Sequence, residues 1–358
     1  MKYPHILTFA LLALFFASCE TVVDFDVEDI EPMLVLHARG STDDNVSARL
    51  SYSRFFLDDR PFQVVKNALV TLQVNGGSPM SLGYSDGLYV SSYTPQPGDT
   101  LTLVAKAGDK EVTAGTRVPR APLIADVKVA PSENYGGYYE KNAYTNYMHK
   151  YMDVDVQLND PANEHNYYSL SMVVCDTIRC KFWMQYPPDG SGITTGDTVD
   201  TVIYIRQTLN MECEDVAVIG TSNNIVDLID EGLEPYVNTA TLLFEDDKIN
   251  GRNYKVRVTI AYCPYQYVDN MACAMGAYIL NTTTLDITGS PHLEVRLDAV
   301  PREVYLYEKS VESQENDELA GIFTEPTQVA GNVNGGIGIF GIRSRTKVVR
   351  DISAILND

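Results

Sequence analysis

A recurring alternation of short apolar runs and turn residues constrains the fold of this chain more than any other feature. From Met33 onward, each run lies within a few residues of a turn such as Asn75-Gly76-Gly77, Ser85-Asp86-Gly87 or Pro97-Gly98-Asp99. Short runs with period-two hydrophobicity, bounded by Gly, Asn or Asp, are typical of β-strands. Many such strands in succession are typical of β-sandwiches. The sequence therefore predicts a mainly β protein.

The first of these runs predict an N-terminal module over residues 33–119. Its strands are expected at residues 33–39, 46–52, 68–74, 88–91, 101–106 and 112–118. This number and spacing of strands favours an immunoglobulin-like or transthyretin-like β-sandwich. Pro119 and Pro122 end the module, because neither can donate to a sheet ladder and each biases the preceding residue toward extended conformations.

A second, larger sandwich-like β domain is predicted over residues 123–358. Its strands are expected at residues 124–130, 153–158, 167–175, 182–185, 201–209, 240–244, 254–262 and 292–299. Asn250-Gly251 predicts a hairpin between the strands on either side of it. A short helix is expected at residues 225–232. A longer one, packed on the sheets, is expected from Pro301 to about Ala320, because apolar residues recur there at helical spacing.

The N-terminus has the layout of a bacterial lipoprotein signal peptide. A charged Lys2 precedes the apolar run Ile6 to Ala13, and Ala17-Ser18 precede Cys19. Small residues admit the peptidase, and the thiol then carries the lipid. Residues 1–18 are therefore predicted to be removed, Cys19 to be the lipid attachment site, and residues 19–32 to form an acidic tether. The alternative is an uncleaved buried helix or an inner-membrane anchor.

The charge and the cysteines bound the function further. A formal net charge of -21 repels nucleic acid phosphates and anionic headgroups, so nucleic acid binding is not expected. An odd number of cysteines after Cys19 leaves at least one free thiol or one intermolecular bond in an exported chain. These cysteines are Cys175, Cys180, Cys213, Cys263 and Cys273. Three disulfides are possible: Cys263 with Cys273, Cys175 with Cys180, or Cys175 with Cys213. The alternative is that these cysteines are buried thiols.

Several sequence patches occur in one order along the mature chain. They are Cys19-Glu20, Pro97-Gly98-Asp99-Thr100-Leu101, Val118-Pro119, Asp160-Pro161, Asn166-Tyr167-Tyr168, Phe244-Glu245-Asp246-Asp247, Asn250-Gly251, Glu325-Pro326 and the run from Gly335 to Gly341. In this order the chain resembles a Bacteroidetes lipoprotein family known as domain of unknown function 4249. The resemblance implies an outer-membrane lipoprotein, often encoded beside a TonB-dependent outer-membrane receptor, and brings no established catalytic residues.

These patches also have a purely structural interpretation. Asp160 is expected to cap a turn that Pro161 preorganises. Tyr167 and Tyr168 are expected on opposite faces of one strand. The run Gly335 to Gly341 predicts a strand whose backbone lies close to another element, in preference to a ligand loop.

Tyrosines form the candidate partner or ligand surface. Tyrosine offers a large rigid face and a hydroxyl at low ordering cost, which suits recognition of sugars, peptides and proteins. The two groups that we expect to form one surface are Tyr135, Tyr138, Tyr139, Tyr144 and Tyr147, and Tyr265 with Tyr267. The alternative is a strand-loop-strand segment whose rings cover the edge of a sheet.

No catalytic, cofactor or metal site is predicted. The chain lacks an H-E-x-x-H motif. Gly83-Tyr84-Ser85-Asp86-Gly87 has the G-x-S-x-G spacing, but it is interpreted as a turn between two strands and not as a nucleophile elbow. Glu164-His165 and Glu245-Asp246-Asp247 are interpreted as turn residues with solvated carboxylates. A calcium loop starting at Asp246 fails, because Lys248 and Arg257 stand at ligand positions.

The sequence thus favours a non-enzymatic, lipid-anchored protein of the outer membrane that faces the cell surface. The expected role is an accessory or ligand-binding partner of a TonB-dependent transporter in nutrient capture, with a peptide or glycan as ligand. The leading alternative is a structural adhesin or fimbrial subunit that polymerises by strand exchange, with residues 346–356 as its terminal strand. A hydrolase is the third hypothesis.

Overall fold

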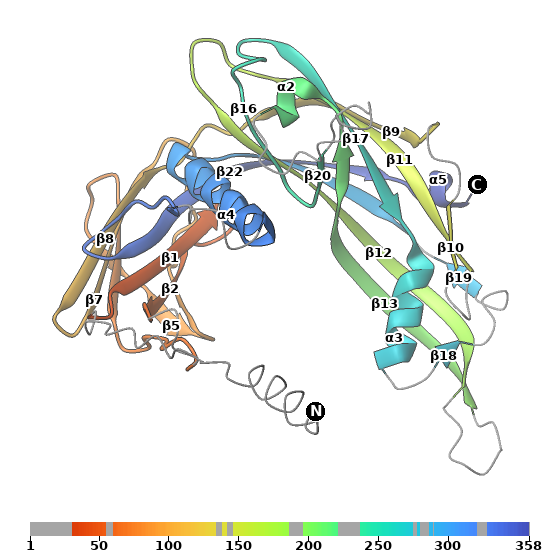
Figure 1. Cartoon of the computed structure of the whole chain (residues 1–358), viewed down its shortest axis with the longest axis horizontal. Coiled ribbons are helices and arrows are strands. Elements are labelled where there is room, and N and C mark those ends of the chain that lie inside the picture. The colour runs from red at the N-terminus through yellow and green to blue at the C-terminus, as the bar shows by residue number, and fades with distance from the viewer. Residues whose placement is uncertain are drawn as a thin grey trace, which may run out of the picture. The chain divides into compact units, whose positions relative to one another are not determined.

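The structure is a computed structural model, and it describes residues 31–54, 60–133, 138–141, 146–185, 196–220, 237–274, 278–279, 286–288, 290–320 and 328–357 (Figure 1). The elements below belong to the unit formed by Met33–Ser53 and Pro61–Asp358. They form three open sheets with few helices, which confirms the prediction of a mainly β protein. Within these residues, no helix combines the length and apolar composition that crossing a membrane requires.

The strands of the first part lie close to their predicted positions, except for two short ones that the sequence does not predict. In order, the strands are β1 (Leu34–Ser41), β2 (Ser47–Tyr52), β3 (Leu69–Val74), β4 (Met80–Ser81), β5 (Gly83–Ser85), β6 (Leu88–Val90), β7 (Thr100–Ala107) and β8 (Lys110–Arg117). The two that the sequence does not predict are β4 and β5. Alternate side chains are buried along them, as in β1, where Leu34, Leu36 and Ala38 point into the core.

Two sheets contribute to this first core. One is the five-stranded sheet β21-β8-β7-β3-β4, in which β21 is Val333–Asn334. The other is the 11-stranded sheet, where β1 lies between β2 and β22 (Ile337–Asp351). Strand β22 comes from the far end of the sequence, pairs with β1 in parallel and adds Phe340 and Ile342 to the first core. The predicted boundary between residues 119 and 123 stays a prediction, and the first core contains side chains from both sides of it.

The remaining strands extend the large sheet and build a third one. They are β9 (Leu123–Pro131), β10 (Tyr138–Lys141), β11 (Asn146–Asn159), β12 (Tyr167–Gln185), β13 (Gly196–Leu209), β14 (Met211–Cys213), β15 (Val237–Thr239), β16 (Leu242–Glu245), β17 (Asn253–Tyr262), β18 (Tyr278–Ile279), β19 (Asp286–Thr288) and β20 (His292–Ala299). The strand expected at residues 182–185 is the end of β12, which continues without a break.

A second core joins these two sheets. Val154 and Val258 of the six-stranded sheet share it with Met172 and Val295 of the large sheet. Consecutive residues of a strand point to opposite faces, so Leu242 joins this core and Leu243 joins a different cluster.

Helix α4 (Arg302–Ala320) confirms the longer predicted helix, and it packs Val304 and Tyr305 onto Leu243 and Ile339. The helices not expected from the sequence are α2 (Val216–Ile219), α3 (Pro264–Ala274) and α5 (Ser353–Asn357). The helix expected at residues 225–232 lies outside the described residues.

Two connections differ from the sequence predictions. The prediction of a hairpin at Asn250-Gly251 is wrong, because the described strands β16 and β17 do not pair with each other. Strand β16 pairs with β12, whereas β17 pairs with β11 and β14. The turn therefore crosses between sheets, and Gly251 supports it with a φ of 69°. Residues 346–356 are not one strand either: β22 ends at Asp351, and α5 follows after the buried Ile352.

The glycine run has the predicted packing role. A β-carbon at Gly336 or Gly338 would collide with the main-chain oxygen of Leu34 or Leu36, and Gly338 has a φ of 125°. At Gly341 it would collide with Val304 of α4. Parallel pairing of β22 with β1 therefore depends on the absence of side chains at these positions.

Candidate functional site

The first group of predicted surface tyrosines lies partly on two paired strands. Tyr138 and Tyr139 belong to β10 and Tyr147 to β11, and the antiparallel register places Glu140 opposite Tyr147. Strand β10 stands at the end of the described strand order of its sheet. Tyr135 and Tyr144 lie outside the described residues.

The second group follows β17, which also pairs with β11. Lys150 of β11 lies opposite Tyr262, and α3, which carries Tyr265, begins two residues after Tyr262. The two groups therefore start from the same end of the β11–β17 pair. Tyr267 is half-buried: its ring contacts Tyr262 with centroids 5.9 Å apart, and its hydroxyl donates to Gln207. Burial raises the pKa of Tyr267 to about 12.

A second region of interest lies where the chain enters β12 and leaves β16. Asp160 accepts a hydrogen bond from the Tyr168 hydroxyl at 2.6 Å and one from the Gly251 amide at 2.8 Å. Burial is the main cause that raises the pKa of Asp160. The sequence predicts that Asp160 caps the turn at Pro161, but the amide that it caps belongs to Gly251, in the turn between β16 and β17. Tyr167 and Tyr168 do face opposite sides, toward Tyr305 and Phe244 respectively.

This turn brings one histidine and three carboxylates together. Strands β12 and β16 pair Tyr167 with Glu245, so continuing the register by two residues sets His165 opposite Asp247. The His165 Nε2 atom lies 3.2 Å from Glu245 Oε2, 3.7 Å from Asp246 Oδ1 and 3.7 Å from Asp247 Oδ1. We call these four residues the acidic turn cluster. The interpretation as solvated carboxylates is wrong for Asp246, whose exposed fraction is 1%.

Asp246 is held in one orientation by amide donors. Its Oδ2 atom accepts from the Asn166 amide at 2.9 Å, the Asn250 side chain at 3.1 Å and the Asn166 side chain at 3.3 Å. The Oδ1 atom is buried and has no hydrogen-bond partner among the described residues. Buried carboxylate oxygens are normally satisfied, so this atom distinguishes the cluster from an ordinary turn.

A second group of metal-ligating residue types is built differently. The ligand atoms of Cys175, His292 and Glu294 lie within 4.8 Å of one another. However, Glu294 accepts from Arg206 at 3.0 Å and also from Arg296. Burial alone would raise the pKa of Glu294, but these guanidinium groups lower it to about 2. The two guanidinium charges already neutralise this carboxylate, so the group is a poor site for a cation.

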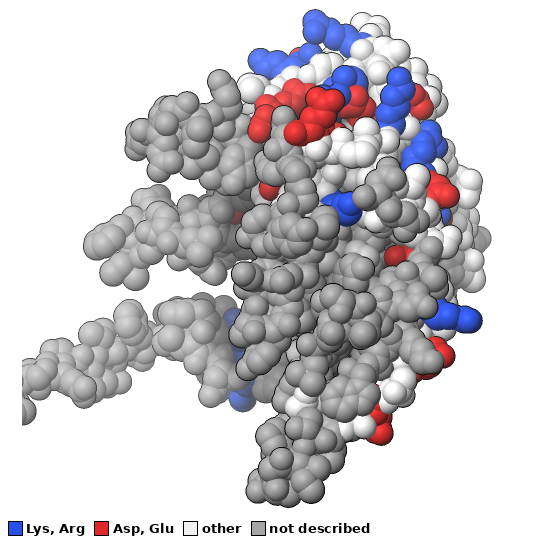
Figure 2. All heavy atoms as spheres, turned by 90° about the vertical axis from the view of Figure 1, so that its right-hand side faces the viewer, with Lys and Arg blue, Asp and Glu red and all other residues white. Residues whose placement is uncertain are grey.

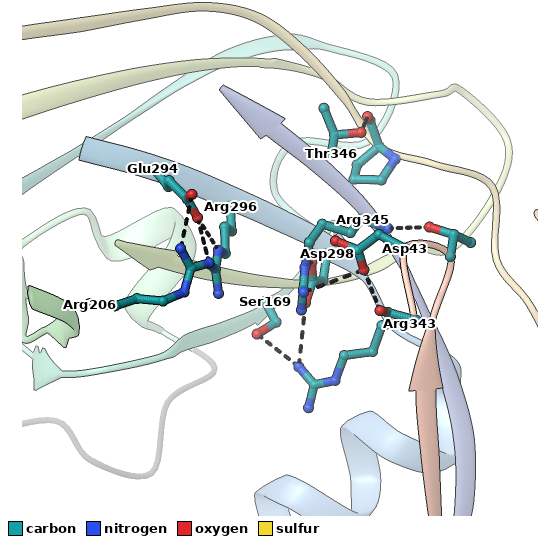
Figure 3. A network of polar contacts seen from close by, with 12 residues as sticks. Asp43, Ser169, Arg206, Glu294, Arg296, Asp298, Arg343, Arg345 and Thr346 are labelled. Atoms are coloured by element: carbon teal, nitrogen blue, oxygen red, sulfur yellow. Dashed lines mark hydrogen bonds and ion pairs between the residues drawn. The ribbon is translucent and has the colours of Figure 1, made fainter. Parts of the chain in front are cut away.

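The same arginine pairing continues along strands β20 and β22 (Figure 3). Asp298 accepts two hydrogen bonds from Arg345, at 2.8 and 2.9 Å, and lies 3.9 Å from Arg343. Arg345 also approaches Asp43 at 3.5 Å, and Arg343 pairs with Glu308 of α4. We call the group formed by Glu294, Asp298 and their arginines the arginine ladder. Acidic and basic side chains are likewise interspersed on the face drawn in Figure 2.

The cysteines do not form the disulfides considered from the sequence. Cys175, Cys213 and Cys273 are free thiols. The Cys263–Cys273 bond is wrong because helix α3 separates the two residues, and ten helical residues span about 15 Å. Cys175 and Cys180 lie five residues apart on one extended strand, β12, which holds their Cα atoms too far apart for a disulfide.

Comparison with known proteins places the chain in a family. No curated protein matches it. A family model described as a domain of unknown function matches residues 20–348, which includes the Asn166-Tyr167-Tyr168 and Phe244-Glu245-Asp246-Asp247 patches. Cys19 and the predicted signal peptide lie outside the described residues. The chain belongs to the family described as domain of unknown function (DUF4249).

Proposed function

We propose that the protein is a non-enzymatic, lipid-anchored accessory of a TonB-dependent outer-membrane transporter. The protein itself faces the cell surface in this proposal. The single observation that supports this proposal best is the arrangement of the tyrosine groups. Tyr138, Tyr139 and Tyr147 lie on a terminal strand and its neighbour, and Tyr265 lies on the helix that follows the next strand. Among the described residues β10 pairs with β11 alone, and an edge strand whose sequence is rich in tyrosine suits an extended peptide or a protein loop.

The proposed anchor explains why weak contacts would be sufficient. A lipid on Cys19 would confine the protein to the plane of the membrane, where a receptor is also confined. The effective concentration of each partner for the other is then high, so a modest interface yields a stable complex. We further propose that the two cores belong to two β-sandwich modules, the first of them immunoglobulin-like or transthyretin-like.

The test is co-purification with a TonB-dependent receptor, which the family resemblance implies as the neighbouring gene product. We expect the lipidated chain to co-purify with that receptor, and the triple variant Tyr138→Ala, Tyr139→Ala, Tyr144→Ala to reduce recovery at least tenfold. Tyr204→Ala is the matched control, because Tyr204 lies on β13 and is 80% exposed. Undiminished recovery and uptake with a folded triple variant would contradict the proposed surface. Normal processing of a Cys19→Ser variant would contradict the anchor.

The fimbrial alternative requires a strand that one subunit can donate to another. Residues 346–351 pair with β20, and the same strand buries Phe340 and Ile342 in the first core. Removing β22 would therefore expose core residues, which favours the accessory proposal. Ladders of polymers on mildly heated gels would instead support the fimbrial function.

A further inference from the structure

We propose that the acidic turn cluster, His165, Glu245, Asp246 and Asp247, binds a divalent transition-metal ion such as Zn²⁺. The cluster lies away from the tyrosine groups in the sequence and joins the segment before β12 to the turn after β16. The proposal therefore goes beyond the accessory function and does not depend on it.

The spacing of the ligand atoms fits one ion. The His165 Nε2 atom and the carboxylate oxygens of Glu245 and Asp247 all lie within 4.8 Å of one another. Zn²⁺ binds imidazole nitrogen and carboxylate oxygen at about 2.0–2.2 Å, which separates neighbouring ligands of a tetrahedron by about 3.3–3.6 Å. The observed distances from Nε2 to the three carboxylates are 3.2, 3.7 and 3.7 Å. His165, Glu245 and Asp247 would therefore hold the ion, and Asp246 Oδ1, 3.7 Å from His165 Nε2, would face it from outside this group of three.

Asp246 provides an independent observation that points to a ligand. Its side chain is 1% exposed, and Oδ2 is fixed by Asn166 and Asn250. This leaves Oδ1 directed toward His165, at a distance too long for a hydrogen bond. Leaving a buried charged oxygen without a partner is costly, whereas a cation at this place would satisfy it.

The local charge also favours a cation. In the described part of the chain, the ion pairs that reach these three carboxylates come from His165 alone. Lys309 acts on Glu245 through its charge, but its ammonium group pairs with Glu312 at 3.2 Å. Arg120 pairs with Glu164 at 3.2 Å. Three carboxylates therefore share one histidine, which leaves room for a divalent charge.

The ligand types indicate which ion binds. Imidazole together with carboxylates suits Zn²⁺ or Mn²⁺, whereas Ca²⁺ prefers a cage of oxygens. The His165 ring stacks on Tyr167, with centroids 4.7 Å apart and planes inclined by 20°, and this contact limits its rotation. The side chains of His165 and Asp247 are 47% and 62% exposed, so an ion can enter from solvent. On binding, the ion would replace the contact between Nε2 and Glu245, with release of any proton on that nitrogen.

The experiment is calorimetric titration of the detergent-solubilised full chain, stripped with a chelator, with Zn²⁺ alone. We expect a site with micromolar or tighter affinity that is weakened at least tenfold by His165→Ala and by Asp247→Asn. His292→Ala is the matched control, because it alters the Cys175 group and should leave this affinity unchanged. A second readout is the visible spectrum of Co²⁺, in which nitrogen and oxygen ligation is distinguished from thiolate ligation.

The proposal has clear contrary outcomes. It is overturned if Zn²⁺ does not bind, or if it binds equally well to the His165→Ala and Asp247→Asn variants with circular dichroism spectra like that of the parent. Thiolate bands that disappear in a Cys175→Ser variant would also overturn it. Displacement of Zn²⁺ by an equal concentration of Ca²⁺ would overturn the assignment to a transition metal.

Discussion

Two clusters of carboxylates lie at different parts of the large sheet and are compensated in opposite ways. In the arginine ladder, Glu294 and Asp298 each contact two arginines. In the acidic turn cluster, His165 alone among the described residues forms ion-pair contacts with Glu245 and Asp246. The ladder thus neutralises itself within the fold, whereas the turn is left with excess negative charge.

The difference follows from where each cluster sits on its strands. In β20, Leu293, Val295 and Leu297 point into the second core, so Glu294 and Asp298 point to the opposite face of the sheet. Strand β22 runs beside β20 and supplies Arg345 opposite Asp298. Glu294 instead pairs with Arg206 of β13 and with Arg296 of β20 itself. Among the residues that the structure describes, no arginine forms an ion pair with the carboxylates at the turn after β16. The pairing of ladder carboxylates with arginines indicates a structural role. The lack of arginine partners at the turn carboxylates, within the described ranges, indicates a ligand.

The largest effect should come from breaking the ladder. We expect Asp298→Ala to lower the free energy of unfolding by about 3–5 kcal/mol, because it leaves the partly buried Arg345 guanidinium without its carboxylate. Urea denaturation measures this loss. A loss below about 1 kcal/mol would show that the ladder is not a structural element and would end the contrast with the turn.

A somewhat smaller effect should come from titrating the ladder. The pKa of Glu294 falls from an ordinary value of 4.5 to about 2 in the folded protein. A lowered folded pKa means that the stabilisation is complete above pH 4.5 and is lost as the pH falls toward 2, up to about 3 kcal/mol. We expect the stability difference between the parent and Glu294→Gln to shrink across this window. A difference that stays constant down to pH 2 would contradict it.

Local sequence patterns predicted the strands well and their pairing poorly. Alternation in segments such as residues 153–158 and 254–262 depends on which side of one strand faces a core, so it is readable from neighbours in sequence. The choice of partner strand depends on distant residues. Asn250-Gly251 has the composition of a hairpin turn, yet the strands on either side of it belong to different sheets. The two sheets lie on opposite sides of the second core, and both strands bury apolar side chains in it.

The candidate site was missed for a related reason. Glu245-Asp246-Asp247-Lys248 has the composition of an exposed turn, and nothing local indicates that Asp246 is buried. Its burial requires the segment ending at Asn166, 80 residues earlier, to donate to its carboxylate. The available signal was the pair of patches Asn166-Tyr167-Tyr168 and Phe244-Glu245-Asp246-Asp247 in the family resemblance, which turn out to be adjacent in space.

The turn should respond to loss of charge in the opposite way to the ladder. In metal-free protein we expect Asp246→Asn to leave the free energy of unfolding unchanged or raise it by up to about 1 kcal/mol. The amide oxygen can still accept from Asn166 and Asn250, while the repulsion among three carboxylates is reduced. Asp298→Asn is the control and should destabilise. Equal destabilisation by both variants, measured in urea, would abolish the distinction between the clusters.

The smallest effect should come from a surface pair whose geometry matches that of the ladder. Asp155 accepts two hydrogen bonds from Arg257, at 2.6 and 2.9 Å, much as Asp298 does from Arg345. The Arg257 side chain is 58% exposed, against 24% for Arg345. Water can therefore solvate Arg257 after its partner is removed, and Asp155→Ala should cost at most about 1 kcal/mol in urea denaturation. If Asp155→Ala and Asp298→Ala lower the free energy of unfolding equally, burial does not set the strength of these pairs. The buried Asp246 Oδ1 atom, which has no hydrogen-bond partner in the described residues, then loses its significance as well.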